Sequence, residues 1–250
     1  FLSRHLITPY MRTKMIDWMI EVLTVYECAP ETFFLSVQIM DQFLSKTQET
    51  LENEHIHLIG MTSMLIAAKF NEIHKIRMWE MVEKIGQKEY KEEDYKIMER
   101  KILNRIGMEN LIQTSVYDLV QTFFYDFTQN TKITNPNDKK FFEFVQETAI
   151  FLSKILCHYE KFYKFDHCYN AIGCLIAAVL IVKEKKIEFC SKEILAMLFN
   201  WINFLDAKNE YDLNQHILYA GEIINAFNSY FMIEGISYNL RYFTPLSYIN

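Results

Sequence analysis

The sequence predicts an all-helical protein made of two tandem five-helix bundles. Turn-forming residues are scarce, with 6 Gly and 4 Pro among 250 residues, whereas an all-β chain of this length needs many turns. Apolar side chains recur at intervals of three and four residues, and strict two-residue alternation is nearly absent. The helical pattern also restarts near the middle of the chain, which indicates two related halves.

Five helices are expected in the first half. The first is apolar over most of its surface, so we expect other helices to surround it. Pro30 suits the first turn of the second helix, and Gly107 suits the end of the fifth. The third carries small residues at helical spacing, among them Gly60, which suits close helix–helix approach. The expected ranges are 11–28, 31–45, 54–71, 78–85 and 91–105.

The second half repeats this order after a boundary near Gly107–Gln113, which gives domains 1–112 and 113–250. The third helix of each half carries the same tetrapeptide, Leu65–Ala68 and Leu175–Ala178. Together with the matching helix order, this repetition indicates an internal duplication. Asn130–Asp138 is the clearest loop. The expected helices of this half are 114–127, 138–159, 167–183, 191–203 and 209–228.

Composition and charge disfavour nucleic-acid and membrane partners. The net charge is −6, and the short clusters Lys139-Lys140 and Lys183–Lys186 do not form a basic footprint, so we expect no direct nucleic-acid partner. The longest uninterrupted apolar run, Ala171–Val182, is too short to span a bilayer, so no membrane partner is expected. Phe1 is not Met, and we expect the natural N-terminus, with any degradation or targeting signal, to precede it.

The residues typical of catalytic and metal sites are missing. Glycine-rich phosphate loops and the G-x-S-x-G elbow do not occur, and His55 and His57 face different sides of a helix. His158 and His167 have no ligand partner at suitable spacing. We therefore expect no enzyme, no cofactor and no metal. The cysteines form no C-x-x-C motif and are expected to be reduced thiols: Cys28, Cys157, Cys168, Cys174 and Cys190.

The first half carries several motifs in a fixed order. They are Leu2–Met11, Met11–Val22, Ile39–Leu44, Leu58–Gly60, Met64–Glu72, and Met98-Glu99 with Ile102-Leu103. In this order they resemble the N-terminal cyclin box of A/B-type (mitotic) cyclins, and the second half resembles the C-terminal box more loosely. The resemblance implies two five-helix cyclin-fold bundles. It also implies a non-catalytic subunit that binds and activates a cyclin-dependent kinase in cell-cycle, mitotic control, in the nucleus and cytoplasm.

Two charged residues match a Lys–Glu pair that, in this family, holds backbone carbonyls near the kinase C-helix. From the residues alone, Lys69 would be a lysine reaching solvent at a helix end, and Glu99 an ordinary surface residue. The resemblance favours a kinase-binding pair. Val179 stands at the repeat position of Lys69, so packing does not require lysine there. The other kinase-binding residues implied are Phe70, Glu72, Leu103 and Met108.

Six residues match the family's docking patch for Arg-x-Leu segments of substrates or inhibitors. Met and Trp would form an adaptable apolar groove, and an acidic residue would pair with the arginine. Equally, Met15 and Trp18 can be plain core. Lys14 stands where the family usually has Ile, and His57 where it has Gln. The matching residues are Met11, Met15, Trp18, Glu21, Ile56 and His57.

The resemblance also implies a structural ion pair, Arg12 with Asp41, between the first two helices. Asn71, Asn110 and Gln113-Thr114 depart from the family pattern, and they bear on the choice of partner. Three alternatives stay open: a transcription-type cyclin or cyclin-fold adaptor, a DNA-binding general transcription factor, and an enzyme with an unrecognised helical site. The Met-Arg…Asp-Trp opening disfavours the first, the acidic charge disfavours the second, and no motif supports the third.

Overall fold

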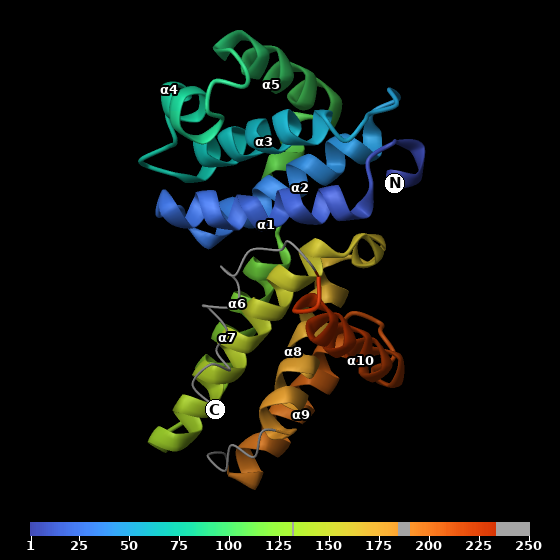
Figure 1. Cartoon of the computed structure of the whole chain (residues 1–250). Coiled ribbons are helices and arrows are strands. Elements are labelled where there is room, and N and C mark those ends of the chain that lie inside the picture. Colours follow the sequence, from blue (N-terminus) through green and yellow to red (C-terminus); the bar gives the residue numbers. More distant parts are fainter. Residues whose placement is uncertain (132, 185–190, 234–250) are drawn as a thin grey trace. The chain divides into compact units, whose positions relative to one another are not determined.

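The computed structural model describes residues 1–131, 133–184 and 191–233, and it divides them into two compact units. The units divide between Ser115 and Val116. Over the described residues the chain forms ten α-helices and no strand, with five α-helices in each unit (Figure 1). This confirms the predicted all-α fold of two five-helix bundles.

The first unit contains the helices expected from the sequence, and the fourth is irregular. The 3₁₀ helix η1 (Leu2–Arg4) precedes them, and α4 continues directly into the π-helix η2 (Met81–Ile85). The 3₁₀ helix η3 (Met108–Ile112) follows α5. The α-helices of this unit are α1 (Pro9–Val25), α2 (Pro30–Lys46), α3 (His55–Asn71), α4 (Met78–Glu80) and α5 (Glu92–Ile106).

Capping explains where these helices begin and end. The Thr8 hydroxyl accepts a hydrogen bond from the amide of Met11 at 3.2 Å, and Pro9 occupies the first turn, so α1 begins two residues before the expected start. Gly107 ends α5 with a φ of +84°, a left-handed conformation that favours glycine.

Helix α3 is the centre of the first unit, where it packs against α1, α2 and α5. Its small residues permit this approach. A Cβ at Gly60 would lie 2.2 Å from Cε and 2.7 Å from Cγ of Met15, so the α1 side chain occupies the space above the glycine. The tetrapeptide Leu65–Ala68 is buried. The structure thus gives the small residues of this helix the packing role predicted for them.

The second unit has the same organisation around α8, which packs against α6, α7, α9 and α10. Its tetrapeptide Leu175–Ala178 is buried like its counterpart in α3. The 3₁₀ helix η4 (Glu160–Lys164) follows α7. The helices are α6 (Val116–Asn130), α7 (Pro136–His158), α8 (His167–Glu184), α9 (Lys192–Lys208) and α10 (Leu213–Tyr230).

Two expectations for the second unit need correction. The expected start of the last helix at residue 209 was wrong, because α9 continues to Lys208 and Asp212 caps α10 through the amide of Asn214. Helix α8 is long and apolar enough to cross a bilayer, although the twelve-residue run alone is not. It is 67% buried inside the unit, as is typical of the core helix of a globular domain.

Candidate functional site

Arg12 and Asp41 form a buried bidentate ion pair between α1 and α2. The Arg12 Nε donates to Asp41 Oδ1 at 2.8 Å, and Nη2 donates to Oδ2 at 2.5 Å. Their side chains are only 2% and 4% exposed. The ring of Phe1 lies 5.9 Å from the guanidinium. This parallel geometry is the arrangement in which arginine binds a carboxylate most strongly, so the pair is placed to hold the two helices together.

Lys69 and Glu99 lie together on the surface of the first unit. Lys69 is in the last turn of α3, and its Nζ donates to both carboxylate oxygens of Glu99 on α5 at 2.7 Å. The side chains are 38% and 21% exposed. An ion pair this open to solvent contributes only about 0.2–1 kcal/mol to folding. Fold stability is therefore a weak reason for its presence.

Large apolar side chains are exposed at the end of each of these two helices or just after it. Phe70, at the end of α3, is 50% exposed, and Ile73 follows it in the open. After α5, Met108 and Ile112 of η3 are exposed, whereas Leu103 is half-buried. Such residues on segments that flank a surface ion pair are typical of a protein-binding face.

Glu72 has a role within the unit. Its Oε1 accepts hydrogen bonds from the amide of Ala29 at 2.7 Å and from the hydroxyl of Thr32 at 2.5 Å. It therefore serves as a cap for the first turn of α2, where Ala29 has no side-chain oxygen of its own. Glu72 also contributes, after burial, to raising the pKa of the Cys28 thiol to about 11.

The residues that depart from the family pattern around η3 form one amide network. Asn110 donates to the carbonyl of Ile106 at 2.6 Å and accepts from Gln113 Nε2 at 2.7 Å. The Gln113 Oε1 in turn accepts from Gln38 and Gln42 of α2, at 2.7 and 3.0 Å. These departures therefore compensate one another, since the polar groups introduced after α5 bind each other and the neighbouring helix.

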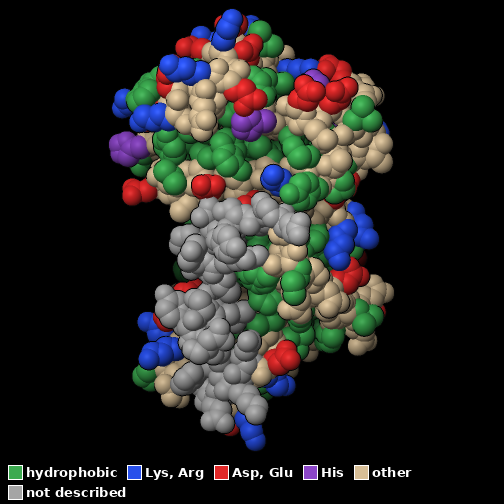
Figure 2. Space-filling view, in the orientation of Figure 1, with side chains coloured by type: hydrophobic (Ala, Val, Ile, Leu, Met, Phe, Trp, Pro, Cys, Tyr) green, Lys and Arg blue, Asp and Glu red, His purple; other side chains and the backbone are tan. Residues whose placement is uncertain are grey.

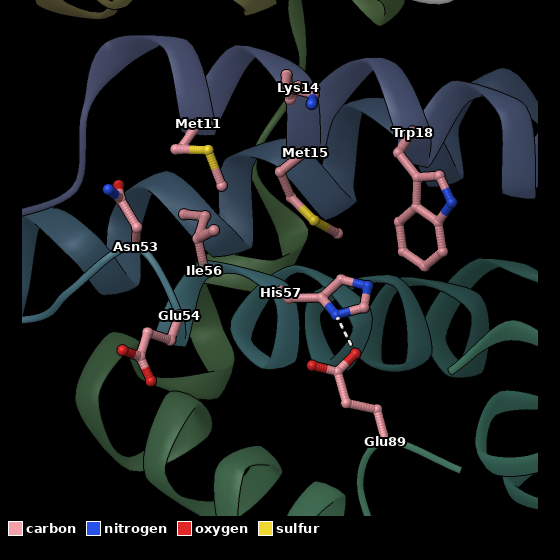
Figure 3. A pocket seen from close by; sticks show the side chains of 9 residues that line it. All are labelled: Met11, Lys14, Met15, Trp18, Asn53, Glu54, Ile56, His57 and Glu89. Atoms are coloured by element: carbon pink, nitrogen blue, oxygen red, sulfur yellow. Dashed lines mark ion pairs between the residues drawn. The ribbon is translucent and has the colours of Figure 1, made fainter. Parts of the chain in front are cut away.

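A cleft of about 440 Å³ lies between α1 and α3. Its apolar floor comes from both helices, and Figure 3 shows Met11, Met15 and Trp18 of α1 pointing toward α3. In the space-filling view hydrophobic side chains are exposed along these two helices, whereas charged ones gather over α5 (Figure 2). The lining residues are Met11, Lys14, Met15, Trp18, Asn53, Glu54, Ile56, His57 and Glu89.

Five of the six residues predicted for the docking patch line this cleft. Glu21 does not, although it is exposed on α1. Met15 and Trp18, for which a core role was the alternative, differ in burial. Met15 is 5% exposed and packs over Gly60 as a core residue, whereas Trp18 is half-buried and forms part of the cleft wall.

The wall opposite α1 is partly aromatic and partly acidic. The ring of His57 lies 5.1 Å from that of Trp18 and 6.0 Å from that of Tyr90. Its Nδ1 is 2.9 Å from a carboxylate oxygen of Glu89. Burial, and then Glu89, raise the pKa of Tyr90 to about 12. Sequence motifs did not indicate Glu89, because it stands in the segment before α5, far from α1 along the chain.

No group of three or more His, Cys, Asp or Glu side chains that could hold a metal ion occurs within residues 1–131, 133–184 and 191–233. Four cysteines are free thiols, and Cys190 lies outside the described residues. His216 is fully buried in the second unit between Asp206, at 2.6 Å from Nδ1, and the Tyr169 carbonyl, at 2.9 Å from Nε2.

The fold and these surfaces define a class: a helical protein with two repeated bundles, the first of which exposes an apolar cleft and a surface ion pair flanked by apolar side chains. Comparisons with known proteins identify the first bundle. Residues 1–109 match the model of the cyclin N-terminal domain. The sequence relatives of the chain are cyclins too.

The sequence relatives are cyclins of several kinds. The chain is 43% identical over 72 residues to the S-phase entry cyclin-5 of Saccharomyces cerevisiae, which covers 29% of this chain and 16% of that protein. It is 30% identical over 159 residues to Cyclin-A2-4 of Arabidopsis thaliana, covering 64% and 32%. The matches thus span less than a third of these relatives' lengths.

Solved structures share the fold at low sequence identity. A viral cyclin from herpesvirus saimiri superposes with a TM-score of 0.61 and 16% identity, covering 90% of this chain and 89% of that one. A chain of the CAK complex of Chaetomium thermophilum, bound to ATP-γ-S, gives a TM-score of 0.55 at 11% identity, covering 96% and 76%. The likeness to the viral cyclin extends over both units.

Proposed function

We propose that this protein is the regulatory subunit of a cyclin-dependent protein kinase, which it binds and activates without catalysing phosphate transfer itself. One observation carries the proposal: the Lys69–Glu99 pair stands at the surface beside exposed apolar residues, within the residues that match the cyclin N-terminal domain. One structural neighbour belongs to a complex bound to an ATP analogue, which supports a kinase-associated role.

The physical basis of activation is a shift between two states of the kinase. Its C-helix glutamate must pair with the β3 lysine before catalysis proceeds. A subunit that binds the active arrangement more tightly moves the kinase toward that arrangement. Lys69 can donate to backbone carbonyls of the kinase, while Glu99 fixes the direction of the ammonium group. Phe70, Leu103 and Met108 would supply apolar contact.

The finer assignment is a mitotic A/B-type cyclin that acts in the nucleus and cytoplasm and docks Arg-x-Leu segments in the cleft. Met11, Trp18 and Ile56 offer an apolar floor for the leucine, and the acidic wall suits the arginine. In a test, Met11→Ala combined with Trp18→Ala lowers phosphorylation of an Arg-x-Leu substrate and spares a short peptide substrate. Equal loss on both substrates would indicate misfolding and contradict the docking assignment.

The kinase assignment is tested by mixing the purified chain with a panel of cyclin-dependent kinases and measuring the Kd and the phosphorylation of histone. Lys69→Ala or Glu99→Ala should cost about 2–5 kcal/mol of binding, because truncation leaves the other charge desolvated at the interface. Lys101→Ala is the matched control, since Lys101 is also 38% exposed and pairs with Glu49 at 2.5 Å. We expect its Kd to change by less than about threefold.

Two outcomes would contradict this reasoning at different levels. Unchanged affinity in both the Lys69 and the Glu99 variants would remove the pair from the interface and leave kinase binding intact. If the wild-type chain formed no complex with any kinase of the panel, the regulatory-subunit proposal itself would fail.

A further inference from the structure

The charges of the cleft lie on opposite walls. Lys14 projects from α1, whereas Glu54, at the start of α3, and Glu89 lie on the other side (Figure 3). The Lys14 Nζ is 5.5 Å from the ring centroid of Tyr10. Among the described residues no carboxylate lies within ion-pairing distance of Lys14. The cleft thus presents an apolar floor between one cation without a carboxylate partner and two anions.

The backbone before α5 places Glu89 on the acidic wall of the cleft. Gln87 and Lys88 adopt φ values of +47° and +65°, a left-handed conformation that is unfavourable for residues with a side chain. This turn brings Glu89 to the cleft, where it pairs with His57 at 2.9 Å. The backbone conformation of the segment before α5 therefore determines where the Glu89 carboxylate lies.

An extended segment bound in this cleft would present side chains to both walls, because alternate residues of an extended chain point in opposite directions. A basic residue is favoured near Glu54 and Glu89. A second basic residue near Lys14 is disfavoured by repulsion, and an acidic residue there gains a partner. A purely basic segment therefore fits the cleft less well than one with both signs of charge.

We infer that Lys14 is a specificity residue of this cleft, which selects docking segments that carry an acidic residue beside their basic and apolar anchors. The inference rests on the docking role proposed above and narrows its ligand class. The observations behind it are the ammonium group of Lys14, which has no carboxylate partner, the opposite acidic wall and the apolar floor between them.

Binding of fluorescein-labelled peptides to the full chain tests this inference by fluorescence polarisation. The peptides share an Arg-x-Leu core and carry Glu, Gln or Lys at one position before or after it. At low salt, the best Glu peptide should bind about threefold more tightly than its Gln counterpart, and the Lys peptide more weakly than either. High salt should reduce the differences in Kd between the three peptides, because salt screens exposed charges.

Two variants separate the effect of Lys14 from that of net charge. Lys14→Gln should remove the preference for Glu, and Lys14→Glu should reverse it, changing the ratio of the Glu and Lys peptide Kd values by about tenfold. Lys75→Glu is the matched control. Lys75 is exposed beyond the far end of α3, and this variant changes net charge equally, so it should keep the wild-type order.

The outcomes distinguish the inference from the docking role. The inference is overturned if the wild-type chain binds Glu and Gln peptides with equal Kd at every position. It is also overturned if Lys14→Glu keeps the wild-type order of Kd values for the Glu, Gln and Lys peptides. Either result leaves the docking role in place. Failure of every peptide to bind overturns both. The same reversal in Lys75→Glu would assign the preference to net charge and overturn the role of Lys14.

Discussion

Removal of the Asp41 carboxylate is a direct test of what holds α1 to α2. In Asp41→Ala the guanidinium of Arg12 loses both charge-assisted hydrogen bonds, at 2.8 and 2.5 Å, in a site that leaves it only 2% exposed. Arginine cannot shed its proton at ordinary pH, so the charge remains.

The expected magnitude follows from this burial. Breaking a buried ion pair by removing one partner costs about 3–5 kcal/mol. A domain has about 5–15 kcal/mol of stability in total, so the variant should lose a large part of it. At about 4 °C per kcal/mol for a unit of this size, the Tm should fall by about 12–20 °C.

The assay is denaturation of the full chain by urea and by heat, followed by circular dichroism. Glu49→Ala is the matched control: Glu49 and Lys101 are as close as Arg12 and Asp41, at 2.5 Å, but their side chains are 56% and 38% exposed. We expect the control to cost less than about 1 kcal/mol. Equal losses in the two variants would refute the reasoning, because burial would then not determine the cost.

Two further predictions concern packing and thiol chemistry. Gly60→Ala should destabilise the chain by about 1–3 kcal/mol in a urea titration, because the new Cβ meets Cγ of Met15 at 2.7 Å. Gly221→Ala is the control. Its Cβ would meet nothing within 4 Å, so this variant should be neutral or stabilising. Cys28, whose pKa is raised to about 11, should react with iodoacetamide at pH 8 about 10²-fold more slowly than an unperturbed thiol, as measured by peptide mass spectrometry. Glu72→Gln should speed this reaction, because the second cause of the raised pKa is removed; an unchanged rate would refute that cause.

The fold could be predicted from the sequence because the helices carry strong local signals. The period of apolar residues and the small residues of α3 predicted which elements form and which one is central. The boundaries were less accurate where capping competes with periodicity. Thr8-Pro9 starts α1 before the first apolar turn, and α9 continues past the expected end at residue 203 to Lys208.

The candidate site was only partly accessible to sequence reasoning. The residues on α1 and α3 belong to recognisable motifs, so most of the residues that line the cleft could be predicted from the sequence. Glu89 could not, because the turn from Gly86 to Glu89 places Gln87 and Lys88, neither of them a glycine, in left-handed conformations. The amide network of Asn110 and Gln113 was also missed, since its partners on α2 are far away in the chain.

The two repeats show why a surface ion pair can form in the first unit and not at the corresponding place in the second. Lys69 and Val179 each follow the shared tetrapeptide directly. Helix α3 ends at Asn71, so Lys69 is in its last turn, where the chain leaves the bundle and the ammonium group reaches solvent. Helix α8 continues to Glu184, so Val179 stays within the core at 1% exposure. A lysine at this position would be a buried cation, which is strongly unfavourable without a partner. The position of the tetrapeptide relative to the end of its helix therefore confines this type of surface ion pair to the first unit.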